Sequence, residues 1–278
     1  MSNPEENSFH LALVEDKLWV ATYPVGMSRY DFAFEQFFAC RHPMPREGTA
    51  TAVARMGAAT DYEQRYDQMA ALNVRLIHTP EEYRRTSELP IWYPLIADLT
   101  ARSVWFEKPP SSSEIMSQFK WPVFVRGGRQ TNRHQRHLSI LEGPADFERV
   151  MEWWDADPIL HWQPVVCREF IPLRLVGEQS PGVMPRAFEF RSFWWKDQCV
   201  GIGPYWMDEH YELTSVEKSA ALVLGGDVAR RLNVTFLVVD LAQRIDGTWI
   251  VIECNDGQDS GYAGVAPFLL WRKVLDII

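Results

Sequence analysis

Two late apolar segments joined by a tight turn constrain the fold most. Residues 234–240 and 248–253 are strand-like, and an Asp-Gly dipeptide between them is typical of a β-hairpin turn. Each segment is apolar except for an acid near its end, which is Asp240 in the first and Glu253 in the second. A hairpin that turns at the Asp-Gly dipeptide brings Asp240 opposite Glu253. The sequence therefore predicts two buried antiparallel strands that carry two acids to their open ends.

Asn255 extends this acid pair to three oxygen-bearing side chains. Side chains alternate along a strand, so Glu253 and Asn255 share one face and Cys254 points to the other. Two carboxylates at close range repel each other unless a cation joins them, and hard oxygen ligands suit Mg²⁺. We therefore predict a magnesium site on Asp240, Glu253 and Asn255. The same residues also fit a solvated turn or, with the EF-hand spacing unmet, a Ca²⁺ loop.

Composition excludes several classes of protein. The 278 residues are 46% hydrophobic and 23% charged, which excludes a disordered or fibrous chain. A net charge of -9 argues against a protein that binds nucleic acid by neutralising phosphates. No stretch reaches the roughly 18–20 apolar residues of a membrane span, and the four cysteines form no Cys-x-x-Cys pair. We expect a cytoplasmic protein with reduced thiols and with neither nucleic-acid nor membrane partners.

The order of predicted elements divides the chain into two parts. A helix over 61–72, a strand over 74–78 and a helix capped by Thr79 predict an α/β unit. The second half reads as strands paired with their neighbours, with a long helix before the late hairpin. We expect an α/β domain over 1–100, followed over 101–278 by a domain of two α+β subdomains. Their boundary is expected near residue 168, so the subdomains cover about 101–167 and 168–278.

Further elements are expected in the first of these subdomains. Residues 113–120 are predicted as a helix that Ser112 or Ser113 caps, and 138–141 as a strand. The polar stretch before this strand carries His134 and His137, which fit a phosphate-covering loop or plain surface.

An apolar strand ends in the sequence Phe124-Val125-Arg126-Gly127-Gly128-Arg129. A cation at a strand end, followed by two glycines, lets the backbone approach an anion closely. The segment is not a Walker P-loop because Gly-Lys-Ser/Thr is absent. A surface turn fits these residues as well.

Two later strands carry charged residues among apolar ones. The strand that runs into Glu169-Phe170-Ile171 ends in an apolar hinge whose backbone groups suit the edge of an adenine. In the second strand, Glu189 and Arg191 share a face. A buried arginine needs a partner, which is either a structural Glu–Arg pair or a phosphate oxygen.

Taken in order, these segments resemble the ATP-grasp superfamily. Its members carry a basic residue at a strand end, a Glu-containing hinge strand, a (D/E)xR strand, and late strands that end in an acid and an ExN pair. The matching segments are Pro122–Arg126, Arg168–Ile171, Glu189–Arg191, Val238–Asp240 and Ile252–Asn255. The chain looks closest to a clade of compact ATP-grasp proteins in which active-site Lys and Arg are exchanged.

The resemblance implies a fold, two cofactors and a reaction. The fold is a preATP-grasp-like α/β domain followed by an ATP-grasp domain that clamps ATP between two α+β subdomains. The reaction implied is an ATP- and Mg²⁺-dependent carboxylate–amine ligation, which forms an amide or peptide bond through an acylphosphate. The substrates implied are small-molecule or peptide carboxylates and amines. A homodimer stays open.

The resemblance also implies roles for individual residues. Arg126 and Arg191 would contact phosphates and act in catalysis, and Asp240, Glu253 and Asn255 would hold Mg²⁺. The residues implied for ATP binding are Arg126, Arg129, Glu169, Phe170 and Ile171. The residues expected near the substrate are Tyr205, Ser260 and Gly261.

Two departures from the family pattern leave the activity open. The family's earlier lysine has no secure match, and Arg102 and Lys108 are the candidates for its place. Most relatives carry Lys at the strand end where this chain has Arg126. Two alternatives to the ligase therefore remain, which are a catalytically silent nucleotide-binding or sensor module and a kinase-like phosphotransferase.

Overall fold

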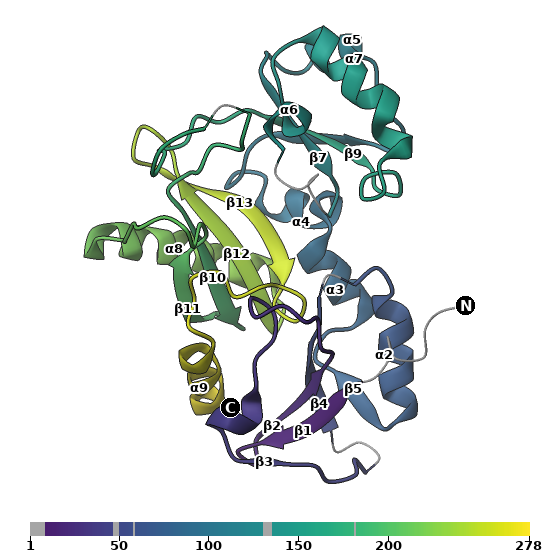
Figure 1. Cartoon of the computed structure of the whole chain (residues 1–278), viewed down its shortest axis with the longest axis vertical. Coiled ribbons are helices and arrows are strands. Elements are labelled where there is room, and N and C mark those ends of the chain that lie inside the picture. The colour runs from purple at the N-terminus through teal and green to yellow at the C-terminus, as the bar shows by residue number, and fades with distance from the viewer. Residues whose placement is uncertain (1–8, 47–49, 58, 130–134, 181) are drawn as a thin grey trace.

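The described residues form three β-sheets, each associated with its own helices (Figure 1). The computed structural model describes residues 9–46, 50–57, 59–129, 135–180 and 182–278. Along the longest axis the sheet nearest the N-terminus lies at one end, and a small sheet lies at the other (Figure 1). The central sheet, built from the second half of the chain, lies between them.

The N-terminal sheet has the strand order β3-β1-β2-β4-β5. Its strands are β1 (His10–Val14), β2 (Leu18–Thr22), β3 (Cys40–Arg41), β4 (Ala50–Arg55) and β5 (Val74–Leu76). The helices of this region are α1 (Phe34–Phe37), α2 (Tyr62–Ala71), α3 (Pro80–Ser87) and α4 (Leu89–Ile96). Strands β2, β4 and β5 run parallel, and α2 connects the last two, as expected of an α/β unit. Thr79 caps α3 in a capping box with Glu82.

The small sheet has the strand order β6-β9-β7-β8, and all its pairs are antiparallel. Its strands are β6 (Ser103–Phe106), β7 (Val123–Gly127), β8 (Ile140–Leu141) and β9 (Val165–Glu169). Its helices are α5 (Ser112–Met116), α6 (Arg136–Ser139), α7 (Pro144–Trp153) and the short 3₁₀ helix η1 (Trp154–Ala156). Of the two histidines singled out above, His137 lies on α6, whereas His134 lies outside the described residues.

Two predictions in this region are wrong in detail. The strand expected over 138–141 is only the two-residue β8, because the preceding residues form the helix α6. The helix expected over 113–120 is the shorter α5, and Ser111 caps it. Glu114 lies three residues after Ser111, and together they complete a capping box that neither Ser112 nor Ser113 forms.

The central sheet has the antiparallel order β11-β10-β12-β13. Its strands are β10 (Glu189–Trp195), β11 (Gln198–Pro204), β12 (Phe236–Gln243) and β13 (Trp249–Asp256). The helices of this part are α8 (Ser215–Leu232) and α9 (Pro267–Ile277). None of the helices in the described ranges combines the length and the apolar character needed to cross a membrane. The expected fold class, α/β followed by α+β, is confirmed, whereas the division into domains at residue 100 stays a prediction.

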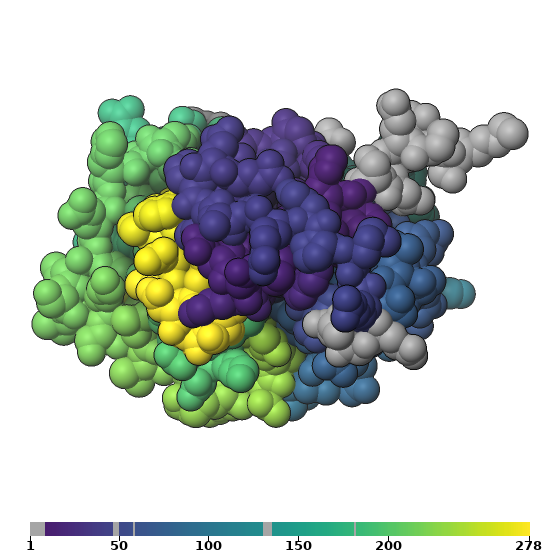
Figure 2. Space-filling model, turned by 90° about the horizontal axis from the view of Figure 1, so that it is seen from below, coloured from purple at the N-terminus to yellow at the C-terminus, as the bar shows by residue number. Residues whose placement is uncertain are grey.

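The two faces of the central sheet differ in what they pack against. One face, with Trp194, Leu237 and Val239, packs against α8 and α4. Part of the other face packs against α9 and the N-terminal sheet through Phe193 and Phe236. Figure 2 shows the N-terminal segment, in purple, lying directly against the yellow C-terminal helix α9. The remainder of this second face carries charged residues and forms the site described below.

Candidate functional site

Three neighbouring strands of the central sheet carry charged side chains at matched positions. Arg191 of β10 is paired with Asp240 of β12, and Asp240 is paired with Glu253 of β13. Residues directly opposite each other in antiparallel strands point to the same face. Asn255 lies two residues beyond Glu253 and shares this face. The structure thus places Asp240 directly opposite Glu253, beside Arg191, whereas Asn255 lies opposite Val238, one step further along the same face.

Two arginines are ion-paired to these acids. The Arg191 guanidinium donates two hydrogen bonds to the Asp240 carboxylate, from Nε to Oδ1 at 2.9 Å and from Nη2 to Oδ2 at 2.7 Å. Arg126, near the end of β7, forms an ion pair with Glu253 through Nη2. Arg126 is 4% exposed and Asp240 is 1% exposed, so each pair has one buried member, whereas Glu253 and Arg191 are partly exposed. The Arg126–Glu253 pair also joins the small sheet to the central sheet.

The acids lie within their strands, which corrects the expectation that they lie at strand ends. Strand β12 continues past Asp240 to Gln243, and β13 continues past Glu253 to Asp256. Both strands therefore extend their backbone hydrogen bonding beyond the acids, which holds the two carboxylates firmly.

A β-bulge in β13 directly precedes Glu253. Asp240 is paired with Glu253 but Leu241 is paired with Val251, so Ile252 is an extra residue. The carbonyl of Ile252 accepts a hydrogen bond of 2.8 Å from Nη1 of Arg168. The bulge thus gives a buried arginine of β9 a backbone partner.

Burial and neighbouring charges shift the pKa values of the acidic side chains in opposite directions. Burial raises the pKa of Asp240, and the Arg191 guanidinium opposes that rise. Burial also favours the neutral form of Glu253, but Arg126 and the other guanidinium groups outweigh it and lower the pKa of Glu253. Burial, reinforced by Asp240, raises the pKa of Glu189 well above its ordinary value. The surroundings therefore favour the charged form of Glu253 and the neutral form of Glu189.

The donor set fits a magnesium ion. Asp240, Glu253 and Asn255 offer carboxylate and amide oxygens, which are the ligands that Mg²⁺ prefers. Arg126 bonds to one oxygen of Glu253, and a carboxylate has about four lone-pair positions, so acceptor capacity remains for a cation. Within the described residues no group of three or more His, Cys, Asp or Glu could hold a metal. Asn255 adds an amide oxygen to the two carboxylates on this face.

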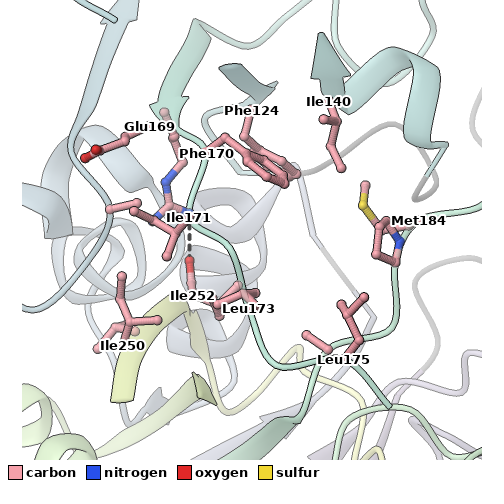
Figure 3. A pocket seen from close by; sticks show the side chains of 15 residues that line it. Phe124, Ile140, Glu169, Phe170, Ile171, Leu173, Leu175, Met184, Ile250 and Ile252 are labelled. Atoms are coloured by element: carbon pink, nitrogen blue, oxygen red, sulfur yellow. Dashed lines mark hydrogen bonds between the residues drawn. The ribbon is translucent and has the colours of Figure 1, made fainter. Parts of the chain in front are cut away.

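An apolar cavity of about 140 Å³ lies between the small sheet and β13 (Figure 3). Figure 3 shows the ring of Phe124 at the cavity, with Ile171, Leu173 and Met184 around it. Its lining residues are Ala101, Phe124, Ile140, Arg168, Glu169, Phe170, Ile171, Leu173, Leu175, Met184, Pro185, Ala187, Ile250, Val251 and Ile252. Phe124 and Arg126 lie two residues apart on β7 and share a face. The cavity and the Arg126–Glu253 pair are therefore on the same side of the small sheet.

The segment Glu169–Ile171 borders this cavity as the chain leaves β9. Glu169 is exposed, and Figure 3 shows its carboxylate directed away from Phe124. The N–H of Glu169 donates to the carbonyl of Arg102 at 2.8 Å. Within the described part of the chain, the N–H groups of Phe170 and Ile171 have no hydrogen-bond partner. The backbone after Glu169, rather than its carboxylate, is thus open to a ligand.

The side chain of Arg129 is held by the N-terminal region. Its Nη2 donates to the carbonyl of Ala59 at 2.8 Å and to the hydroxyl of Tyr83 at 2.6 Å. Its guanidinium lies 5.2 Å from the Tyr83 ring and 5.8 Å from the Trp162 ring. Only the carbonyl of Arg129 contacts Arg126, at 2.9 Å from Nη2. The structure therefore brings the backbone of Arg129, but not its guanidinium, to the Arg126–Glu253 pair.

Two of the three residues expected near the substrate contact Arg191. The Arg191 guanidinium lies 5.1 Å from the ring of Tyr205, and its Nη1 donates to the carbonyl of Gly261 at 2.9 Å. Ser260 differs, because its hydroxyl donates to the carbonyl of Asp256 at 2.6 Å and the residue is 6% exposed. Its side chain is thus engaged inside the protein.

Two further charged residues of the cluster were not among the predicted site residues. Glu189 is 7% exposed and lies on the same face as Arg191. Arg168 is 5% exposed and bonds to Thr100 and Ser103 through their hydroxyls. The signal for both was present in the sequence, since each is a charged residue within an otherwise apolar strand.

The fold is similar to that of three solved ATP-grasp and ligase structures. The RimK domain protein ATP-grasp from Sphaerobacter thermophilus has a TM-score of 0.55 at 13% identity, with 76% of this chain and 73% of that chain covered. N5-carboxyaminoimidazole synthase from Aspergillus clavatus, solved with ADP and 5-aminoimidazole ribonucleotide, has a TM-score of 0.55 at 10% identity. That match covers 81% of this chain but only 59% of the synthase.

The third structure is D-alanine–D-alanine ligase from Bacillus anthracis, solved with ATP. Its TM-score is 0.51 at 12% identity, with 75% of this chain and 69% of the ligase covered. Identities this low establish a shared fold and nothing finer.

Sequence comparison identifies the family. No curated protein sequence gives a significant match to the chain. The family model described as ATP-grasp domain, R-to-K clade family 3, matches residues 107–274, which is more than half of the chain. This segment includes Arg126, Arg191, Asp240, Glu253 and Asn255. The chain therefore belongs to the ATP-grasp family, in family 3 of its R-to-K clade.

Proposed function

We propose that the protein is an ATP- and Mg²⁺-dependent ligase that joins a carboxylate to an amine. The observation that carries the proposal is the cluster of Arg126, Arg191, Asp240 and Glu253 beside an apolar cavity. A nucleotide needs an apolar site for its base and complementary charge for its phosphates. Similar folds solved with ADP or with ATP support this proposal.

The base would occupy the cavity beside the Glu169–Ile171 segment. Phe124 offers a ring face for stacking, and the backbone N–H groups of Phe170 and Ile171 offer donors. An adenine edge carries one acceptor and one amino donor, which suits such a backbone segment. The triphosphate would then extend along β7 toward Arg126.

The arginines and acids would act on the phosphates. Arg126 would turn from Glu253 to a phosphate oxygen, and Arg191 would stabilise charge on the transferring phosphoryl group. Mg²⁺, held by Asp240, Glu253 and Asn255, would neutralise phosphate charge. Because all these groups act by charge and position, the reaction requires no protein nucleophile.

The proposed reaction balances in two steps. An oxygen of the substrate carboxylate attacks the γ-phosphorus of ATP, the bond to the β-phosphate oxygen breaks, and ADP leaves. The amine then attacks the acyl carbon, inorganic phosphate leaves, and the amine proton passes to phosphate or solvent. The products are an amide, ADP and phosphate.

The test uses hydroxylamine to trap the acylphosphate. The protein is incubated with ATP, Mg²⁺ and a panel of carboxylates, and hydroxamate and ADP are measured. We expect both products with at least one acid, and a loss of about 10²–10³-fold in Glu253→Gln. The control is Glu142→Gln, because Glu142 pairs with Arg136 at the surface and is expected to keep full activity. Unchanged hydroxamate formation in Glu253→Gln would contradict the metal assignment.

A second candidate, a silent nucleotide-binding module, is favoured by one observation. Asp240 and Glu253 are each already ion-paired with an arginine, so part of their charge is neutralised without a metal. Such a module would bind ATP, as measured by calorimetry, but give neither ADP nor hydroxamate. A stable phosphorylated product in place of hydroxamate would instead indicate a phosphotransferase.

A further inference from the structure

Arg55, the last residue of β4, is a buried cation surrounded by backbone carbonyls. The residue is 3% exposed. Its Nη1 donates to the carbonyl of Gly257 at 2.5 Å, and its Nη2 donates to the carbonyls of Ser260 at 3.0 Å and Tyr30 at 3.1 Å. A weaker bond of 3.3 Å reaches the carbonyl of Gln258. The guanidinium of an N-terminal strand is thus bound mainly to the segment that follows β13.

No carboxylate forms an ion pair with Arg55 among the described residues. Its guanidinium lies 4.5 Å from the ring of Tyr262 and 6.0 Å from that of Trp271. Its buried Nε has no hydrogen-bond partner in the part of the chain that the structure describes. The charge of Arg55 opposes the burial that raises the pKa of Asp259, but burying a cation without a direct ion pair still costs free energy. The arrangement is therefore a poor way to gain stability, and its effect is to fix the path of the segment it binds.

The segment Gly257–Gly261 connects to the charged cluster at both of its ends. It begins just after Asn255 and Asp256, at the end of the strand that carries Glu253. It ends at Gly261, whose carbonyl accepts from Arg191 at 2.9 Å. A shift of this segment would therefore move Asn255 at one end and the partner of Arg191 at the other.

The segment has little freedom to take another path. A side chain at Gly257 would lie 2.5 Å from the ring of Phe236, and one at Gly261 would lie 3.2 Å from the carbonyl of Arg29. The N–H of Tyr262 also donates to that Arg29 carbonyl at 2.7 Å. Arg55 is thus the charged member of a tightly packed support.

We propose that Arg55 is a positioning residue for the charged cluster. By holding the carbonyls of Gly257 and Ser260, it sets Asn255 and Arg191 in the orientation that metal-bound triphosphate requires. The N-terminal region thereby takes part in the chemistry of the central sheet without contacting the nucleotide. This inference rests on the proposed function.

The test compares ATP binding with and without magnesium in full-length variants. Arg55→Lys keeps the charge but loses the planar fork that bonds to several carbonyls. We expect its affinity for ATP with Mg²⁺ to fall by about 10- to 100-fold, the usual effect of removing a residue that orients metal ligands. Its affinity for ATP in the presence of EDTA should stay within about twofold of the wild type, because the adenine cavity is untouched.

A second measurement removes the side chain and restores the cation. Arg55→Ala should lose the same magnesium-dependent affinity, and added guanidinium at concentrations too low to unfold the protein should restore it. Hydrogen exchange of amides 257–261 should be faster in both variants and slow again with guanidinium. This second readout does not depend on activity.

Arg65→Lys is the matched control. Arg65 also lies in the N-terminal region, 4.9 Å from the ring of Tyr23, and pairs with Asp61. Its variant should bind ATP as the wild type does, with and without magnesium.

The outcomes separate this inference from the proposed function. An equal loss of ATP affinity with and without Mg²⁺ would mean a merely structural role and would overturn the inference alone. So would an Arg55→Lys variant that binds Mg²⁺ and ATP as the wild type does. A wild-type protein that binds no ATP with Mg²⁺ would overturn the proposed function, and the inference with it.

Discussion

One face of the central sheet has an apolar half and a charged half, which are built from the same strands. On β10, Arg191 and Phe193 lie two residues apart, and on β12 the corresponding pair is Asp240 and Val238. Phe193 and Val238 are fully buried against α9 and the N-terminal sheet. Arg191 and Asp240, one step along the same strands, form a buried ion pair.

The difference shows how a fold tolerates a buried charge cluster. Breaking a buried ion pair by removing one partner typically costs about 3–5 kcal/mol, and keeping it adds little. The apolar half supplies burial that holds the strands in register, and the register in turn aligns Arg191, Asp240 and Glu253. Stability and chemistry are therefore divided between neighbouring positions, and substitutions in each half should affect different measurements.

The largest effect is expected in the charged half. Arg191→Lys should lower the rate of ATP-dependent turnover by about 10³–10⁵-fold, or roughly 4–7 kcal/mol of transition-state stabilisation. Lysine keeps the charge but cannot donate two parallel hydrogen bonds to the Asp240 carboxylate. The rate is measured as ADP release under saturating ATP. Arg186→Lys is the control, because Arg186 pairs with Asp208 and Glu209 away from the cluster. Equal rates of ADP release in Arg191→Lys and Arg186→Lys would contradict the assignment of turnover to the charged half.

The next effect is expected in the apolar half. Phe236 is fully buried, and Phe236→Ala should lower the free energy of unfolding by about 3–5 kcal/mol. The folded fraction should still bind ATP in the presence of EDTA, because Phe236 does not line the apolar cavity proposed for the base. Urea denaturation measures the loss. Val216→Ala, at a position 80% exposed, should stay within about 0.5 kcal/mol of the wild type.

A smaller effect is expected at the cavity. Phe124→Ala should weaken ATP binding by about 1–3 kcal/mol, the usual contribution of stacking between a base and an aromatic ring. Calorimetry with ATP and with triphosphate alone separates base from phosphate recognition, and only ATP binding should fall. Phe37→Ala, at an exposed position on α1, serves as the control. Triphosphate binding that falls as much as ATP binding would mean that Phe124 supports the fold rather than the base.

The smallest effect is a difference in pH dependence between the halves. The folded pKa of Glu253 is lowered, so its ion pair stabilises the protein above the ordinary pKa of a glutamate and stops doing so as pH falls through the lowered value. The stability deficit of Glu253→Gln should therefore shrink as pH falls from about 7 to about 3. Phe236→Ala should keep the same deficit throughout. Thermal unfolding across that range measures both, and parallel curves would contradict the role of the charge.

The local parts of the fold were predictable because short-range rules decide them. The Asp-Gly dipeptide placed the hairpin, although the bulge at Ile252 is what sets Glu253 opposite Asp240, and Thr79 with Glu82 fixed the start of α3. Strand β4 was missed, because its alternating alanines carry no strand signal. Helix α4 was missed as well, because Pro94 lies inside it and a proline argues against a helix interior.

The partners of the site residues were predictable only in part. The residue types and the shared face of Glu253 and Asn255 follow from alternation along one strand. The Arg126–Glu253 pair joins residues 127 positions apart, and no local rule selects it. The same holds for Arg129, whose guanidinium is captured by Tyr83 from a region that the family resemblance does not cover.

The extra residue at Ile252 has one further consequence. Val251 packs with the α8 side of the sheet, whereas Glu253, only two positions on, points to the opposite side beside Asp240. The alternation of side chains between the two faces thus shifts by one residue at this point. The face to which the Glu253 carboxylate points therefore depends on the number of residues before it as well as on their identity. Without the bulge, a strand of the same length would pair Ile252 with Asp240 and turn Glu253 into the helix-covered core, which would leave Arg126 without its partner.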